Sequence, residues 1–126
     1  MLATKIAQSD TRRTETPNAL MTTLASPTQG GTEALSLWRV RMHPGQSGPV
    51  HTFDVEQVWH VLEGEATVVI DGESIELSVG DTVVMSAGTP RQIRTDSGAD
   101  FVVVGLASGQ ASTPDGGQAV SPPWIV

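Results

Sequence analysis

The chain has 126 residues, which is enough for one domain with a packed core and too few for two. It contains no cysteine, and this excludes disulfides, thiolate metal sites and a thiol nucleophile. Its net charge of −7, with only seven Lys and Arg residues, excludes the basic face that a nucleic-acid-binding protein needs.

Membrane and export signals are also missing from the sequence. No apolar run approaches the roughly 20 residues that span a bilayer. Residues 1–10 lack the apolar stretch of a secretory signal. We therefore expect a cytoplasmic protein that does not contact membranes.

The beginning of the chain carries few signals of regular structure. Residues 1–16 are polar and without periodicity, which predicts a flexible N-terminal arm. Residues 17–126 are expected to form the single domain. Within it, the segment NALMTTLA at 18–25 is the one stretch that suggests a helical turn.

From residue 34 to about residue 106 the pattern is that of β-strands. Short runs rich in Val, Ile and Thr are separated by turn residues, a spacing that favours a sandwich or a small barrel. Asp71-Gly72 lies between two such runs and predicts a hairpin, because a type I′ turn needs positive φ at both central residues. The expected strands lie at 34–42, 57–62, 65–70, 74–79, 81–85, 91–95 and 100–106.

Residues 107–126 form a tail rich in Ser, Gly and Pro that ends in the apolar sequence WIV. Exposure of the indole ring of Trp124 to water is unfavourable, so we expect this residue to dock on the domain. This end and residues 18–25 are candidates for covering a sheet edge or the mouth of a barrel.

Two groups of residues have the spacing of paired motifs, G-x5-H-x-H-x3-4-E-x6-G and G-x5-P-x-G-x2-H-x3-N. The matching positions hold Gly45, His51, Phe53, Gln57 and Gly64, and then Gly80, Ser86, Gly88, Arg91 and Thr95. On this spacing the chain resembles the cupin family, and in particular small single-domain cupins of actinobacteria. The resemblance implies an all-β, cupin-type jelly-roll β-sandwich barrel and a homodimer.

In metal-binding cupins, the residues matching positions 51, 53, 57 and 91 supply three histidines and a carboxylate to the ion. Here Phe53 has no lone pair, and Arg91 has only donors and a fixed positive charge. We therefore expect no cofactor; a divalent metal is the disfavoured alternative, held by His51 and Gln57. His60 is expected on the opposite strand face and His43 at the rim.

Strand alternation places further side chains around these positions. Trp59 is expected to share the inner face with Gln57, and Ile93 to share it with Arg91. Phe53 lies on the face of His51. Each residue also has an ordinary structural explanation: the aromatic rings fill the barrel, Arg91 pairs with Asp96 or Glu56, and His51 is a hydrogen-bonded structural residue.

The strand at 34–42 has two distinct faces. Trp38 and Met42 alternate with Arg39 and Arg41. The arginine face is expected outside, because charged side chains are usually solvated. The alternative register turns both arginines inward and makes the pocket an anion trap together with Arg91.

Three functions follow. The favoured one is an enzyme of lyase, isomerase or cyclase type that transfers protons without a metal, with His51 as acid or base, Arg91 as fixed charge and Gln57 as orienting group. The others are a metal-dependent dioxygenase or isomerase with a reduced ligand set, and a ligand-binding protein without catalysis. The partner is a small organic molecule, anionic or aromatic, held by Phe53, Trp59, Trp38, Met42 and Ile93.

Overall fold

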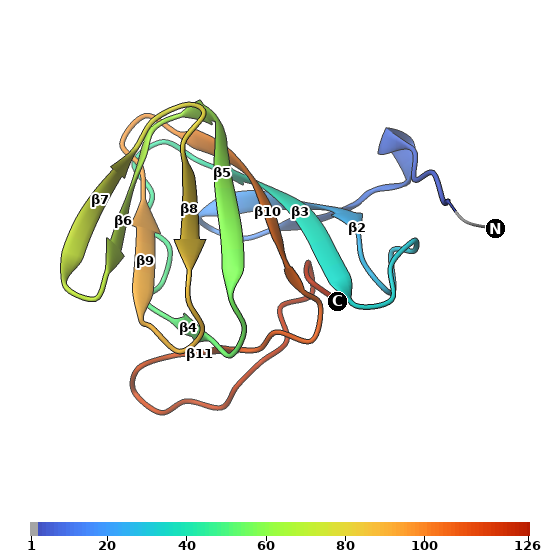
Figure 1. Cartoon of the computed structure of the whole chain (residues 1–126). Coiled ribbons are helices and arrows are strands. Elements are labelled where there is room, and N and C mark those ends of the chain that lie inside the picture. Colours follow the sequence, from blue (N-terminus) through green and yellow to red (C-terminus); the bar gives the residue numbers. More distant parts are fainter. Residues whose placement is uncertain (1–2) are drawn as a thin grey trace.

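A computed structural model describes residues 3–126, and its regular secondary structure is almost entirely β-strand (Figure 1). A single 3-10 turn, η1, spans Gln8–Asp10, and no helix in the described part of the chain is long and apolar enough to cross a membrane. The strands are β1 (Arg12–Glu15), β2 (Ala19–Ala25), β3 (Leu35–Met42), β4 (Thr52–Phe53), β5 (Gln57–Gly64), β6 (Ala66–Ile70), β7 (Glu73–Leu77), β8 (Thr82–Met85), β9 (Arg91–Arg94), β10 (Ala99–Leu106) and β11 (Ala111–Ser112).

The strands form two main antiparallel sheets that pack face to face. The larger has the order β1-β2-β3-β10-β5-β8, and the smaller has the order β7-β6-β9. A short pair, β11-β4, lies near one end, where the C-terminal segment crosses beneath the sandwich (Figure 1). The predicted all-β jelly-roll sandwich is confirmed, and the expected strands at 34–106 all form.

The core lies between the sheets and follows strand alternation. On β3, Trp38, Val40 and Met42 are buried, whereas Arg39 and Arg41 are on the outer face. Both arginines bind Asp100 of β10, at 3.0 and 3.2 Å. The outward register is confirmed, and the alternative of inward arginines is wrong.

The hairpin between β6 and β7 has the predicted geometry. Asp71 has a φ of 50° and Gly72 a φ of 76°, as a type I′ turn requires. A different constraint acts at Gly64, the last glycine of the first motif. Its φ is 78°, and a Cβ there would overlap the carbonyl oxygen of Gly98 on the neighbouring chain segment.

The segment at 18–25 is a strand, so the expected helical turn is wrong. Strand β2 pairs antiparallel with β3, with Met21 opposite Val40. Its Met and Leu residues suit a helix, but the ladder that β3 offers outweighs this weak preference. The expected arm at 1–16 also holds regular structure, since β1 extends the sheet beyond β2. Residues 1 and 2 of that arm lie outside the described residues.

The C-terminal residues pack against β2 and the turn that follows it. Ile125 is fully buried in the core cluster, and Trp124 packs against that cluster. Thr23 donates a hydrogen bond to the main-chain oxygen of Trp124 at 2.6 Å, and Ser26 donates one to Val126 at 2.8 Å. The apolar end of the chain therefore docks on the domain, as expected.

Candidate functional site

One cavity of about 630 Å³ opens between the sandwich and the C-terminal segment. Among the residues that the structure describes, no Asp, Glu, Lys or Arg lines it. Most of the lining is aliphatic or aromatic, which is typical of a small-molecule site. Seven of the eight predicted site residues line it: Trp38, Met42, His51, Phe53, Gln57, Trp59 and Ile93.

His51 lies beside β4, where its backbone exchanges hydrogen bonds with Arg91 at 3.1 and 3.0 Å. Its ring nitrogen Nδ1 is 2.7 Å from the carbonyl oxygen of Pro49. A carbonyl oxygen can only accept, so Nδ1 carries the proton and donates it. The other nitrogen, Nε2, therefore keeps its lone pair in the neutral ring.

The environment of His51 also favours the neutral ring. Burial lowers the pKa of His51 below 6.5, and the positive charge of Arg91 lowers it further, while the hydrogen bond to Pro49 acts in the opposite direction. Of the two effects that lower the pKa, burial is the larger. The result is an imidazole base at neutral pH on the wall of an apolar cavity.

Gln57 is held by two donors at one oxygen. Trp59 Nε1 and Arg91 Nη2 each donate to its Oε1 at 3.0 Å. Because both neighbours are donors, the amide oxygen must face them, and this fixes the orientation of the side chain. The amide nitrogen then faces away from both, and no acceptor for it is found among residues 3–126. Among the described residues no hydrogen bond joins Gln57 to His51, which leaves a bound ligand as the group that Gln57 can orient.

Arg91 is the predicted site residue that does not line the cavity. It is 1% exposed, and its guanidinium carbon lies 4.8 Å from the centre of the Phe53 ring. No ion pair joins Arg91 to Asp96, Glu56 or another acid within the described chain. Burial lowers its pKa to about 10, so it remains protonated near neutral pH. In this placement, the fixed charge expected at position 91 does not reach a ligand in the cavity directly.

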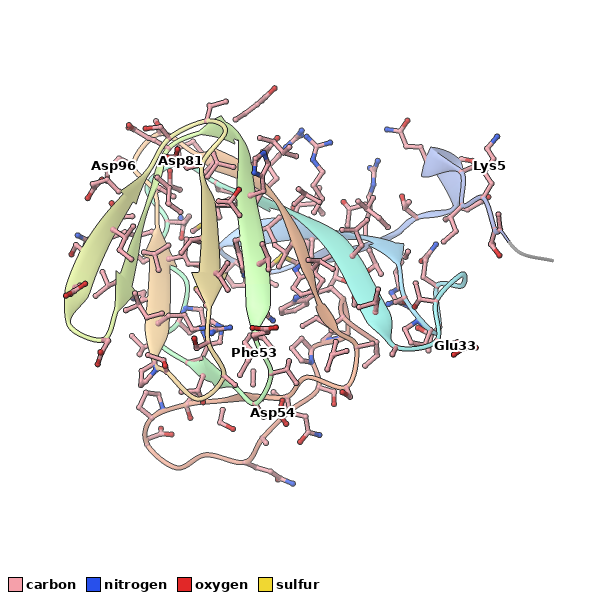
Figure 2. All side chains as sticks on the ribbon, viewed as in Figure 1. Lys5, Glu33, Phe53, Asp54, Asp81 and Asp96 are labelled. Atoms are coloured by element: carbon pink, nitrogen blue, oxygen red, sulfur yellow. The ribbon has the colours of Figure 1, made fainter. Side chains whose placement is uncertain are left out.

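Phe53 connects the two parts of the site. Its ring lines the cavity, has the guanidinium of Arg91 over it, and makes an edge contact with the His51 ring at 5.3 Å between centroids. Figure 2 shows Phe53 inside the sandwich, at the end near β4, with Asp54 beyond it toward the C-terminal segment. Asp81 and Asp96 lie at the opposite end of the sandwich.

The four positions that hold a metal in related folds do not fit a cation here. Phe53 offers no donor atom, and Arg91 brings a positive charge into the same space. The one oxygen of Gln57 already accepts two hydrogen bonds, including one from that charge. His51 alone is left as a ligand, which is short of the three or four that a transition metal usually takes. Nor does the described part of the chain bring three His, Asp or Glu together elsewhere.

The other two histidines do not join this site. His60 is on the outer face of β5, where Nδ1 lies 2.8 Å from the hydroxyl of Thr82 on β8. The expectation that it faces away from Gln57 is confirmed. His43 is half-buried, its backbone N–H donates to Asn18, and it does not line the cavity.

Several lining residues were not predicted. Asn18 and Met21 come from β2 and the turn before it, and Gln118 and Trp124 come from the C-terminal segment. Asn18 and Met21 were not predicted because residues 18–25 were interpreted as a helical turn. The expected docking of Trp124 was a signal for the last, although the sequence did not indicate which surface it would cover.

Comparison with known proteins places the fold. Residues 38–106, more than half of the chain, match the family model described as Cupin domain. No curated protein is significantly similar to the chain in sequence.

Solved structures show the same architecture. The polyketide cyclase RemF from Streptomyces resistomycificus is 22% identical, with a TM-score of 0.70. The match covers 82% of this chain and 78% of the RemF chain. The DMSP lyase DddQ from Ruegeria pomeroyi is 19% identical, with a TM-score of 0.75. The match covers 87% of this chain and 64% of the DddQ chain. Salicylate 1,2-dioxygenase from Pseudoaminobacter salicylatoxidans is 22% identical with a TM-score of 0.72; it covers 85% of this chain, which spans 31% of that enzyme. At these identities the likeness shows the fold alone.

Proposed function

The chain belongs to the cupin family, and from this premise we propose that it is a small-molecule enzyme that transfers protons without a metal. The observation that carries the proposal is the pairing of a base and a donor in one uncharged cavity. His51 offers the lone pair of Nε2, and Gln57 offers the N–H of its amide. The reaction class is that of a lyase, an isomerase or a cyclase.

The substrate that suits this site is an uncharged organic molecule with a ring and an acidic C–H next to a carbonyl. The absence of charged groups from the described lining favours a neutral molecule over the anion that the sequence also allowed. Trp59, Phe53 and Trp38 supply flat apolar surfaces against which a ring can stack.

The chemistry begins when His51 Nε2 removes the proton. The electron pair of the C–H bond moves toward the carbonyl oxygen, which becomes an enolate, and Gln57 Nε2 donates a hydrogen bond to it. Arg91 holds the other end of the amide, so its charge polarises Gln57 and strengthens that donor. The imidazolium then returns the proton to another atom or to a leaving group. A positioned base of this kind contributes typically about 10²- to 10⁴-fold in rate.

The similar structures support these reaction classes by name only. One is a polyketide cyclase and another is a DMSP lyase. The dioxygenase among them belongs with the metal-dependent alternative, which the donor set at positions 51, 53, 57 and 91 disfavours. The remaining alternative is a protein that binds the same kind of ligand without reaction, and the apolar cavity favours it as second candidate.

The test uses 2-tetralone, a neutral two-ring ketone with an acidic C–H beside the carbonyl. Exchange of that proton for deuterium, followed by ¹H NMR, reports His51 as a base even though 2-tetralone is not the natural substrate. We expect the protein to accelerate exchange, His51→Gln to abolish it, and chelator treatment to leave it unchanged. His60→Gln is the matched control, because that imidazole is on the outer face.

Two results would reject the proposal. Binding of 2-tetralone without accelerated exchange would leave the ligand-binding protein in its place. Loss of exchange on chelation, restored by one divalent metal, would establish the metal-dependent alternative.

A further inference from the structure

Arg91 is a cation that lies next to the cavity without reaching it. Its side chain is buried, it does not line the cavity, and it has no carboxylate partner within residues 3–126. One guanidinium nitrogen, Nη2, is bound to Gln57, whereas Nη1 has no acceptor among the described residues. A ligand carboxylate that came into contact with this group would find hydrogen-bond donors in the geometry that arginine offers to anions.

Phe53 stands where that contact would form. Its ring lines the cavity, and the guanidinium carbon of Arg91 lies 4.8 Å from the ring centre. The edge contact with His51 holds the ring from a second direction. Phe53 is itself 5% exposed, so it is packed in place.

We infer that Phe53 sets the charge of the ligand: by covering Arg91, it makes the cavity select neutral ring compounds and reject carboxylates of the same shape. The inference uses the same cavity as the proposed function, but it concerns binding and does not depend on catalysis.

The physical reason is desolvation. A carboxylate that enters the cavity gives up its water, and the described lining returns only neutral donors such as the Gln57 amide. The covered cation cannot replace that water with hydrogen bonds. A ketone needs a single hydrogen-bond donor at its oxygen, which Gln57 supplies. Its desolvation therefore costs much less free energy than that of a carboxylate.

The test compares 2-acetylnaphthalene with 2-naphthoate, which share the ring system and differ by a methyl group in place of a charged oxygen. Isothermal titration near neutral pH gives the two affinities. We expect the wild-type protein to bind the ketone at least about tenfold more tightly. In Phe53→Ala the naphthoate should gain about 10- to 100-fold, the effect of a charge-assisted hydrogen bond to the uncovered arginine.

Two controls assign the gain. The double variant Phe53→Ala/Arg91→Met must lose it, because the cation is gone. Trp124→Ala also removes an aromatic lining residue but one that is not over Arg91, so it should weaken both ligands without favouring the anion. Phe53→Val serves as a second uncovering variant if thermal unfolding shows that Phe53→Ala is not folded.

The inference is overturned if the wild-type protein binds naphthoate as tightly as the ketone, or if the gain in naphthoate affinity survives without Arg91. Failure of both compounds to bind would reject the cavity as the ligand site and with it the proposed function. Charge selectivity without any exchange of 2-tetralone protons would reject the proton-transfer function and leave this inference standing.

Discussion

At the scale of single residues, His51 owes its chemistry to a backbone atom. The carbonyl of Pro49 fixes the proton on Nδ1, and burial keeps the ring neutral. Replacing this half-buried, neutral histidine by glutamine should therefore alter not only turnover but also how stability depends on pH.

The sign of that dependence follows from linkage. The pKa of His51 in the folded protein is below 6.5, so the unfolded chain binds more protons once the pH falls to that region. The contribution of the neutral ring is fully present above pH 6.5 and is lost as the pH falls further. We expect the free energy of unfolding of wild type, relative to His51→Gln, to decrease between about pH 7.5 and about pH 5. Urea titrations of both proteins measure this, and an unchanged difference would contradict it.

Substitution of Arg91 should affect the stability of the protein and its activity differently. Its Nη1 lacks an acceptor within the described chain, and no acid offsets its charge. Arg91→Met should leave the free energy of unfolding unchanged or raise it by roughly 1–3 kcal/mol, the cost of one unsatisfied buried donor. The same variant should lower kcat, because the amide of Gln57 is no longer polarised. Denaturant curves and exchange rates are the two measurements.

Arg91→Lys is the companion variant, since it keeps a charge but loses the planar geometry. A partial recovery of kcat relative to Arg91→Met would support the electrostatic role. Equal rates in both variants, or a large loss of stability in Arg91→Met, would show that Arg91 serves packing alone.

Single positions were largely predictable because a strand has a period of two. Counting along β3 and β5 placed Trp38, Met42 and Trp59 on the correct face. Strand alternation predicts the face of the sheet from which a side chain projects, but not whether that side chain reaches the cavity. For this reason the sequence did not predict that Arg91 lies outside the cavity lining. Its long side chain turns back to Gln57 and passes behind Phe53, which no pattern in the sequence expresses.

At the scale of elements, turn chemistry was the most reliable guide. Glycines and the Asp71-Gly72 pair marked the ends of the strands, and β3 and β5–β10 formed where they were expected. The segment of β2 was misassigned because its propensity is ambiguous and because the residues with which it pairs lie 12 to 23 positions further along the chain.

Gly64 and Gly72 provide a matched pair for separating two effects. Their φ values are 78° and 76°, so both lie in the left-handed region, where any side chain strains the backbone. A Cβ at Gly72 meets open space, whereas one at Gly64 overlaps the Gly98 carbonyl. Gly72→Ala should lower the free energy of unfolding by about 1–2 kcal/mol, from strain alone. Gly64→Ala should cost a further 1–3 kcal/mol or so for overpacking. Equal losses in denaturant titrations would contradict the close approach.

At the scale of the whole molecule, the outer face of the larger sheet carries an apolar stripe. Its members are direct cross-strand neighbours on four adjacent strands: Leu37, Val104, Val58 and Val84. Leu37 and Val84 are exposed, at 36% and 60%. Beside the stripe are Arg39 and Arg41, whose charges offset Asp100. Asp100 and its cross-strand neighbour Glu63 balance these two arginines. In a chain with a net charge of −7, a flank without net charge makes this a face on which a second copy meets little repulsion.

We therefore expect a homodimer that pairs these stripes. Light scattering at micromolar concentration should give twice the mass of the chain, and Val84→Lys should shift it to the monomer. Val79→Lys is the control, since Val79 is equally exposed, at 62%, but lies in the turn after β7. A monomeric wild-type protein, or a shift of the same size in both variants, would contradict the interface.

The path of the C-terminal segment has a consequence for how this protein can change. Residues 113–119, the exposed loop after β11, contribute Thr113 and Gln118 to one wall of the cavity yet belong to neither main sheet. Substitution or lengthening there alters which molecules fit without disturbing a ladder or the core. The barrel and the wall can thus diverge at different rates. Substitutions in the wall can therefore change the ligand preference while folding stays intact and His51 and Gln57 keep their positions in the sandwich.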